Sequence, residues 1–240
     1  MSNFETILYE KKNGTAYVTL NRPKALNAYN IRIRDEMYQV LGAVRDDPDV
    51  RVIIFSGAGD KAFCAGADLT EFLTAPSPVI ARQVRFERDV WSRFLSIDKP
   101  IIAALHGYVL GDGVEIAACC DIRIASDDVQ FGTPEMGLGI ITAAGGSQTV
   151  PRIINRSHAL DVLITGRWVK AEEALKMKLV NRIVTRGELM STAEKIADRI
   201  KSFDPIAVSI VKQAVTRGMN MTLSQGLELE AALAKRSQAS

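Results

Sequence analysis

The first quarter of the chain alternates short apolar and polar runs before a longer helical pattern. Residues 6–20 read as two strand-like runs separated by Asn13 and Gly14, a dipeptide typical of a two-residue hairpin turn. Over 31–44, apolar side chains recur at helical spacing. The β-branched run at 50–57 then predicts a buried strand. This part of the chain is therefore predicted to form a hairpin, a helix and a third strand.

The middle of the chain mixes short elements with loops of small residues. The pattern predicts a small-residue loop over 57–69, an amphipathic helix over 78–97, and a strand running into a Gly-rich turn over 99–111. A short helix over 114–121 and a strand over 122–126 follow. The core positions predicted for the amphipathic helix are Val79, Val84, Val90, Phe94 and Leu95.

The last part of the chain is mostly helical. A final strand is predicted at 179–184, and five segments carry apolar residues at helical spacing. Early strands followed by late helices favour an α/β core at 1–185 and a helical C-terminal region at 186–240, rather than a doubly wound sheet. The predicted helices cover 156–166, 171–178, 187–202, 205–218 and 222–236.

Composition narrows the class of protein. The 240 residues are 47% hydrophobic and 24% charged, which is ordinary for a globular protein with a sizeable core. The 30 basic and 28 acidic residues give a formal net charge of +2 and are well mixed along the chain. No basic stripe with interleaved aromatic residues occurs, so the sequence predicts no nucleic-acid partner.

The cysteines and the first residues of the chain indicate the cellular compartment in which the protein is expected. Cys64, Cys119 and Cys120 are an odd number with two adjacent, which disfavours a disulfide framework and favours a reduced compartment. Residues 1–12 lack the basic and apolar regions of a secretory signal. No apolar run approaches the roughly 18–20 residues that cross a bilayer. We therefore expect a cytoplasmic protein that binds no membrane.

Two familiar cofactor signals fail. GAGDKA at 57–62 has the letters of a dinucleotide-binding fingerprint, but it lacks the helix that should follow and the acidic residue at a later strand end. Nicotinamide binding is therefore not expected. His106 and His158 are far apart and have no cysteine or carboxylate at metal-ligand spacing, so no metal site is expected either.

Two loops of very small residues carry candidate chemistry. AFCAGADL at 62–69 and HGYVLGDGVE at 106–115 both expose backbone N–H groups, because small side chains let a ligand approach closely. Two such donors aimed at one point form an oxyanion hole. Taken singly, each loop is better explained as a simple tight turn, and only the two loops together with the carboxylates Glu115 and Glu135 favour a site.

Two carboxylates follow loops in the middle of the chain, Glu115 in GDGVEIA and Glu135 in FGTPEMG. Glu115 and Glu135 both lie in apolar surroundings, where carboxylates are rarely buried without a partner. Two such acids close together have raised pKa values and share a proton, which suits general acid/base catalysis near neutral pH. A helix-start position for Glu115, or a salt bridge to an arginine for Glu135, explains one residue but not the pair.

At these residues the chain resembles the enoyl-CoA hydratase/isomerase, or crotonase, superfamily. The matching motifs occur in the family's order over nearly the whole chain. The resemblance implies a ClpP/crotonase-like spiral of stacked ββα units with a C-terminal helical region, usually assembled as trimers or dimers of trimers. The motifs are NRPKALNA, KAFCAGADL, KPIIAALHGYVLGDGVEIAACCDIRIA, FGTPEMGLGIITAAGGSQ and ALDVLITGRWVKAEEALKMKLVNRIV.

The resemblance also implies a function and a site. The family's oxyanion amides map to Ala67 and Asp112, and the hydratase glutamates map to Glu115 and Glu135. It therefore implies an enoyl-CoA hydratase that needs no cofactor, since coenzyme A is part of the substrate. The contacts to the CoA thioester map to Lys24, Ala25, Leu26, Ala65, Gly66, Asp68, Leu69 and Gly111.

Other readings of the same resemblance stay open. A glutamate pair also shuttles a proton between carbons without adding water, so an enoyl-CoA isomerase or a ring-acting hydratase or hydrolase is the nearest alternative. A non-catalytic relative that binds acyl-CoA or RNA is a second one. The intact glutamate pair favours the hydratase.

The chain departs from the family's pattern in three places. Asp112 replaces the usual glycine, and because its charge would oppose an oxyanion we expect its side chain to point away or to meet a basic group. The alternative is that the Asp112 side chain shapes an unusual acyl pocket. Thr142 and Ala143 replace a usual Pro-Gly, which bears on substrate range. The chain also ends at AKRSQAS, roughly two dozen residues, or one helix, before relatives usually do.

Overall fold

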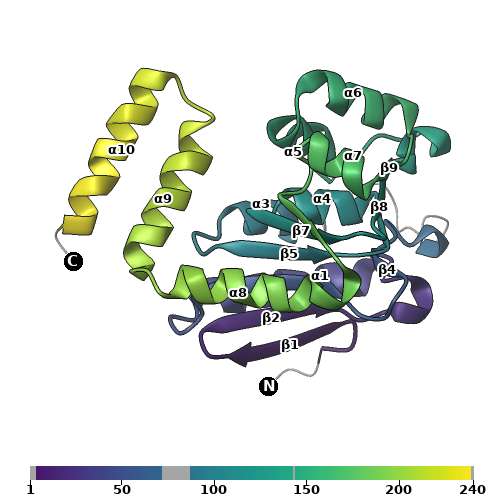
Figure 1. Cartoon of the computed structure of the whole chain (residues 1–240), viewed down its shortest axis with the longest axis horizontal. Helices are drawn as coiled ribbons and strands as arrows, with labels where there is room; N and C mark the ends of the chain where they lie inside the picture. Colours follow the sequence, from purple (N-terminus) through teal and green to yellow (C-terminus); the bar gives the residue numbers. More distant parts are fainter. Residues whose placement is uncertain (1–3, 72–86, 143, 239–240) are drawn as a thin grey trace.

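Two β-sheets form the centre of the molecule (Figure 1). The computed structural model describes residues 4–71, 87–142 and 144–238. The six-stranded sheet has the order β1-β2-β3-β5-β7-β10 and is parallel except for the β1–β2 pair. The four-stranded sheet has the order β4-β6-β8-β9. The strands are β1 (Ile7–Lys12), β2 (Thr15–Leu20), β3 (Val52–Gly57), β4 (Ala62–Cys64), β5 (Ile101–Leu105), β6 (Tyr108–Leu110), β7 (Ile122–Ser126), β8 (Gln130–Gly132), β9 (Val169–Lys170) and β10 (Arg182–Val184).

Helices surround these sheets and continue beyond them at the C-terminus. Four of the described helical segments are short 3-10 turns, and the others are α-helices. The 3-10 turns are η1 (Pro23–Ala25), η2 (Leu69–Glu71), η3 (Pro134–Leu138) and η4 (Arg186–Glu188). The α-helices are α1 (Ile31–Asp46), α3 (Val90–Leu95), α4 (Asp112–Ala118), α5 (Gly146–Ile153), α6 (Arg156–Thr165), α7 (Ala171–Lys176), α8 (Leu189–Lys201), α9 (Pro205–Gly218) and α10 (Leu223–Gln238).

The order of strands produces a spiral. β3, β5 and β7 of the large sheet are each followed directly by a strand of the small sheet, namely β4, β6 and β8. The chain then returns to the large sheet, so each circuit stacks on the previous one and its strands pair in parallel. This confirms the predicted α/β spiral of ββα units, and the helical C-terminal region follows it.

Local sequence explains the elements that were predicted best. Asn13 and Gly14 both have positive φ, 50° and 76°, as the tight turn between β1 and β2 requires. Helix α1 begins after Asn30, whose side chain accepts a hydrogen bond of 2.9 Å from the Ile33 N–H. The hairpin, the helix and the strand predicted for the first part of the chain are confirmed.

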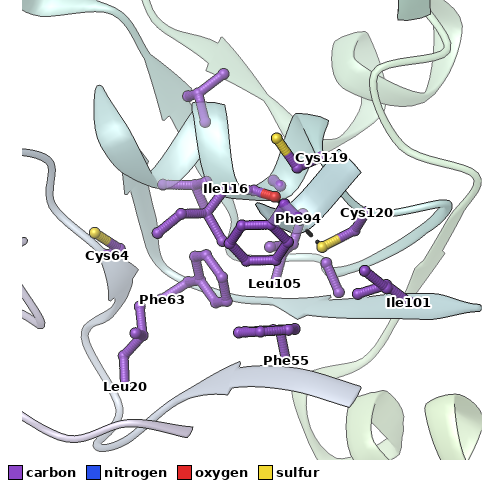
Figure 2. Packing of buried hydrophobic residues seen from close by; sticks show 14 of the residues in the cluster. Leu20, Phe55, Phe63, Cys64, Phe94, Ile101, Leu105, Ile116, Cys119 and Cys120 are labelled. Atoms are coloured by element: carbon purple, nitrogen blue, oxygen red, sulfur yellow. Dashed lines mark hydrogen bonds between the residues drawn. The ribbon is translucent and has the colours of Figure 1, made fainter. Parts of the chain in front are cut away.

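The core is divided by the large sheet. Strand β3 is buried on both faces: Ile53 and Phe55 point into the larger cluster, whereas Val52 and Ile54 point into the smaller one. Figure 2 shows Phe55, Phe63 and Phe94 packed together in the larger cluster, and the Phe55 and Phe94 ring centroids are 5.1 Å apart. Both faces of this central parallel strand are therefore covered, which explains its apolar run from Val52 to Phe55.

Helix α8 covers the other face of the large sheet. Leu189, Ala193 and Ala197 lie on one side of this helix and are buried against β3, β5 and β7. Their spacing of four residues places them on one helical face. The first helix of the predicted C-terminal region thus packs on the core, and the division at residue 185 stays a prediction.

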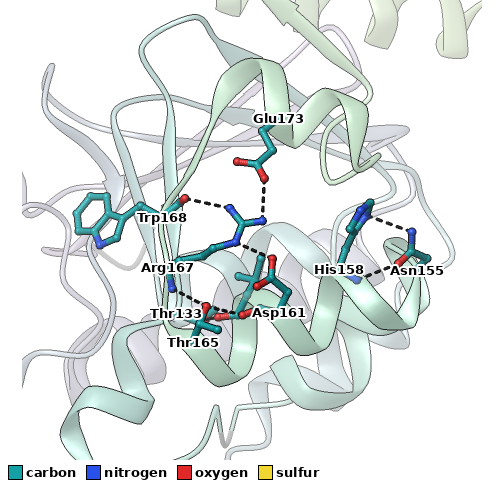
Figure 3. Close-up of polar contacts among 9 residues, drawn as sticks. Thr133, Asn155, His158, Asp161, Thr165, Arg167, Trp168 and Glu173 are labelled. Atoms are coloured by element: carbon teal, nitrogen blue, oxygen red, sulfur yellow. Dashed lines mark hydrogen bonds and ion pairs between the residues drawn. The ribbon is translucent and has the colours of Figure 1, made fainter.

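Helices α6 and α7 are joined by an arginine. The Arg167 guanidinium lies 2.6 Å from the Asp161 carboxylate on α6 and 2.7 Å from the Glu173 carboxylate on α7 (Figure 3). The next residue, Trp168, meets the Tyr108 ring edge-on. These contacts fix the α6–α7 pair against the small sheet.

Helices α9 and α10 pack on each other and project from one end of the molecule (Figure 1). They leave several large apolar side chains exposed. None of the helices in the described ranges combines the length and the apolar character that a bilayer span requires. The exposed side chains are Ile206, Val211, Val215, Met219, Leu223 and Leu227.

The structure differs from the sequence expectations in the small sheet and at Leu95. The small sheet was not predicted, because β4 was read as part of a loop and β8 and β9 were not recognised as strands. Leu95, predicted to be buried, is 65% exposed at the end of α3, whereas Val90 and Phe94 are buried as expected. Val79 and Val84 lie outside the described residues.

Candidate functional site

The two small-residue loops meet through their glycines. Gly66 and Gly111 have positive φ, 92° and 49°, and their backbones are in direct contact. A Cβ atom on Gly66 would lie 3.2 Å from the Leu110 carbonyl oxygen, and one on Gly111 would lie 3.4 Å from the Gly66 Cα. The residue after each glycine is one of the two predicted oxyanion positions, Ala67 and Asp112. The fold therefore brings these two positions side by side.

The backbone N–H groups of Ala67 and Asp112 donate no hydrogen bond within the described residues. Within 4–71, 87–142 and 144–238, no hydrogen bond of the protein uses either N–H group. Both residues also line one cavity of about 280 Å³. A thioester oxygen in this cavity is the kind of acceptor that such paired donors stabilise.

Glu115 lies on α4 with its side chain buried beneath the loop that precedes α5. Its Oε1 accepts hydrogen bonds from the Ala144 N–H at 3.1 Å and the Gly146 N–H at 2.7 Å. A Cβ on Gly146 would lie 2.7 Å from the same oxygen, so this approach requires glycine. These two amides were not recognised in the sequence, although the GG pair in TAAGGSQ was visible as a site of close approach.

Glu135 lies on η3 and lines the same cavity. Its Oε1 lies over Gly111, because a Cβ on that glycine would be only 2.7 Å away. Its Oε2 is buried and has no hydrogen-bond partner among the described residues. Burial raises the pKa of the Glu135 carboxyl, which favours its protonated form.

The cavity that these residues share is lined by aromatic and charged side chains as well. Tyr29 and Trp91 contribute neighbouring rings with centroids 6.1 Å apart. Neither was singled out from the sequence, because a lone aromatic residue in a loop or helix is more often part of a core. The full lining is Tyr29, Arg34, Ala67, Arg88, Asp89, Val90, Trp91, Asp112, Glu115, Glu135, Ile140, Ile141 and Ala144.

The Asp112 side chain corrects one sequence expectation. It does not point away from the site but lines the cavity beside Glu115 and Glu135. Burial is the main cause that raises the pKa of Asp112 to about 6, and the Glu135 charge adds to it. Burial and then the Asp112 charge raise the pKa of Glu115 to about 8. The cavity thus holds three carboxyls whose pKa values are all raised above their ordinary range.

The predicted CoA-contact segment lies beside the first loop. Lys24 and Ala25 form η1, and Leu26 follows with a φ of 52°. The Leu26 carbonyl accepts a 3.0 Å hydrogen bond from the Ala65 N–H, which ties the two segments together. Lys24 is exposed to solvent. Their roles in binding coenzyme A stay a prediction.

Asp68 and Leu69 complete the predicted set. The Asp68 carboxylate is 2.9 Å from the Arg22 guanidinium and accepts a 2.7 Å hydrogen bond from the Thr70 hydroxyl. Leu69 begins η2 and is 55% exposed. The Asp68 side chain is therefore engaged within the protein, whereas Leu69 is free to contact a ligand.

Asn27 is a supporting residue that sequence reasoning did not single out. It is fully buried, and its amide group donates 2.9 Å hydrogen bonds to the carbonyls of Ala58 and Ala62. Its side-chain oxygen accepts one from the Arg22 N–H. Asn27 thus holds the segment around η1 against the loop that carries Ala67.

Replacing Asn27 by alanine should destabilise the fold by about 2–4 kcal/mol, because buried carbonyl and N–H groups lose their partners. Urea unfolding followed by circular dichroism measures this change. Asn21→Ala is the matched control, since the Asn21 side chain makes no hydrogen bond in the described structure. Equal midpoints for the two variants would contradict this account of Asn27.

The residues considered for metal binding lie elsewhere. His106 is buried with an Nε2 that has no partner among the described residues, and His158 contacts Asn155 at the start of α6 (Figure 3). Within the described ranges, no three or more His, Cys, Asp or Glu side chains are grouped to hold a metal ion.

Comparison with known proteins places this site in a family. The enoyl-CoA hydratase/isomerase family model matches residues 10–240. A short-chain-enoyl-CoA hydratase of Clostridium acetobutylicum is 42% identical over 93% of this chain and 86% of its own length. A crotonyl-CoA hydratase of Syntrophomonas wolfei is 40% identical over 95% of this chain and 88% of its own.

Solved structures agree with the sequence comparison. The crystal structure of an enoyl-CoA hydratase from Bacillus anthracis superposes with a TM-score of 0.94 at 33% identity, covering 98% of this chain and 92% of that one. Sequence, fold and the convergence of two loops on a pair of glutamates all lead to one assignment: the chain belongs to the enoyl-CoA hydratase/isomerase family.

Proposed function

We propose that this chain adds water across the 2,3-double bond of 2-enoyl-CoA thioesters to give 3-hydroxyacyl-CoA products. One observation carries the proposal: Glu115 and Glu135 line the same cavity as Ala67 and Asp112, whose N–H groups are uncommitted. The relatives named short-chain-enoyl-CoA hydratase and crotonyl-CoA hydratase support the same reaction and favour a short acyl chain.

The thioester oxygen accepts hydrogen bonds from the N–H groups of Ala67 and Asp112. As the water oxygen bonds to C3, the electron pair of the double bond moves toward the thioester carbonyl. An enolate then forms, with its negative charge on the thioester oxygen. Removing one such donor raises a barrier by about 3–4 kcal/mol. The two amides therefore act mainly on the charge that develops during the reaction rather than on the substrate itself.

The two glutamates divide the proton transfers. Glu115 positions the water and takes its proton as the C3–O bond forms. Glu135, whose burial favours the protonated form, gives its proton to C2 of the enolate. The water has then been added as hydroxyl at C3 and hydrogen at C2. After product release, the proton on Glu115 returns to Glu135 through solvent, which restores the starting state.

The decisive experiment incubates the protein with crotonyl-CoA in ¹⁸O-labelled water. We expect loss of the conjugated enoyl thioester absorbance and a 3-hydroxybutyryl-CoA product that carries the label. A product with a migrated double bond and no label would instead assign an isomerase. Absence of turnover on short, long, branched and cyclic enoyl-CoA substrates would leave the proposal without support and favour a binding protein.

The remaining features follow from the same proposal. Lys24, Ala25, Leu26, Ala65 and Leu69 bind the CoA portion of the substrate, and the reaction needs no further cofactor. The chain works in the cytoplasm as a homotrimer or a dimer of trimers. Support for assembly comes from the exposed apolar side chains that α9 and α10 carry away from the core.

A further inference from the structure

Asp112 places a third carboxyl in the cavity that holds the glutamate pair. Asp112 and Glu115 are three residues apart on α4, so their side chains leave the same face of this helix. Both line the cavity, and their carboxyl groups are within hydrogen-bonding reach of each other. Glu135 faces them from η3.

The hydrogen bonds of Glu115 leave one of its oxygens for Asp112. Oε1 accepts both described N–H bonds, from Ala144 and Gly146. No described N–H or O–H group of the protein donates to Oε2 or to the Asp112 carboxyl. Two carboxyl groups form a hydrogen bond only when one of them carries a proton.

The two arginines that line the cavity, Arg34 and Arg88, form ion pairs with Asp35. Arg34 lies 2.9 Å and Arg88 3.2 Å from the Asp35 carboxylate. Within the described residues, neither guanidinium forms an ion pair with Asp112. The Asp112 charge is therefore not neutralised by a positive side chain from α1 or from the residues before α3.

The other titratable groups around Asp112 do not supply a compensating charge either. Tyr29 and Cys64 are buried, and burial raises the pKa of both side chains, so they stay neutral. Asp89 contributes a carboxylate that accepts hydrogen bonds from Ser92 at the start of α3. Since none of these groups offsets the negative charge of Asp112, a proton shared with Glu115 is the remaining way to reduce it.

We propose that Asp112 and Glu115 share one proton, and that this proton passes from Glu115 to Asp112 as negative charge develops on the thioester oxygen. The transfer removes a like charge from beside the oxyanion and turns Glu115 into the carboxylate that accepts the proton of water. The inference rests on the proposed hydratase function and adds a positioning role for the Asp112 side chain.

The protons balance through the cycle. Before reaction, the three carboxyls hold two protons, one on Glu135 and one shared by Asp112 and Glu115. Glu135 gives its proton to C2, and the Asp112–Glu115 pair gains the proton released by water. Two protons are again present at the end, and one returns to Glu135 before the next turnover.

Loss of the shared proton at alkaline pH places two charges beside the oxyanion and should end activity. Because burial and the Asp112 charge raise the pKa of Glu115, this loss is expected above neutral pH. In Asp112→Asn the amide group cannot ionise, and it donates to Glu115 at every pH while the backbone N–H is retained. The alkaline limb of kcat/KM should therefore move to higher pH.

The test measures kcat/KM for crotonyl-CoA hydration between about pH 6 and 10, a range that spans the shifted carboxyl titrations. We expect the ratio of kcat/KM at pH 9 to that at pH 7 to be about three- to tenfold higher in Asp112→Asn than in the wild type. Asp127→Asn, the same substitution at an exposed residue, should follow the wild type. Coincident normalised profiles for wild type and Asp112→Asn would overturn the inference while leaving the hydratase proposal intact.

A second measurement does not depend on turnover. A carboxyl whose pKa is raised by folding stabilises the protein below its ordinary pKa, near 4, and this stabilisation is lost as the pH rises toward the folded-state value. The Tm of Asp112→Asn minus that of the wild type should therefore be higher at pH 8 than at pH 5, by about 2–4 °C. Asp127→Asn should show the same Tm difference at both pH values. If no enoyl-CoA is hydrated and this Tm difference is independent of pH, both proposals fail, and if only turnover is absent, the shared proton survives alone.

Discussion

Glu135→Gln should lower kcat for crotonyl-CoA hydration by about two to four orders of magnitude. Glutamine matches the shape of the protonated glutamic acid but has no proton to give to C2. Its neighbours impose little change, since Oε1 lies over Gly111 and Oε2 has no described partner. Steady-state kinetics over a range of substrate concentrations measures the effect, and KM should change far less than kcat.

The control for this prediction carries the same substitution on the surface. Glu172 lies exposed on α7, away from the cavity, so Glu172→Gln should retain wild-type kinetics. Calorimetric binding of butyryl-CoA, a saturated thioester, should be similar for wild type and Glu135→Gln. Near-normal hydration by Glu135→Gln would remove Glu135 from the role of acid.

Glu115→Gln should reduce kcat by a similar factor, about two to four orders of magnitude, for a different reason. The glutamine oxygen still accepts hydrogen bonds from Ala144 and Gly146, so the loop before α5 should keep its position. The variant lacks a group that takes the proton of water. The measurement is again kcat with crotonyl-CoA, together with the Tm to show that folding is retained.

The double variant sharpens this test. Groups that act as one unit in a reaction lose most of their effect when either is removed, so their contributions do not add. Glu115→Gln combined with Glu135→Gln should therefore be about as slow as the slower single variant. Fully multiplicative losses would show that the two glutamates act in independent steps, contrary to the proposed division of labour.

Sequence predicted the parts of the fold that local chemistry determines. The hairpin at Asn13 and Gly14 and the helix that begins after Asn30 depend on residues close in the chain, and both occur as expected. The small sheet was missed because β4 and β8 have three residues each and their pairing partners lie far away in sequence. Such short strands have too few positions to display alternation.

The candidate site also contains residues that could be predicted from the sequence and residues that could not. The motifs located Glu115, Glu135 and the two loops, because each motif carries its own close-packed glycine or acid. The expectation that the Asp112 side chain points away was wrong, because this side chain lines the cavity, whereas the alternative that it shapes the acyl pocket stays a prediction. Tyr29 and Trp91 were missed because only the fold brings them to the cavity.

The contact between Gly66 and Gly111 also limits how this protein can be redesigned. A side chain at either position would be strained by the positive φ and would meet the Leu110 carbonyl or the Glu135 carboxyl. Libraries that aim to change the accepted acyl group should therefore leave both loops untouched. Diversity belongs instead at Ile141, which lines the cavity and is 68% exposed.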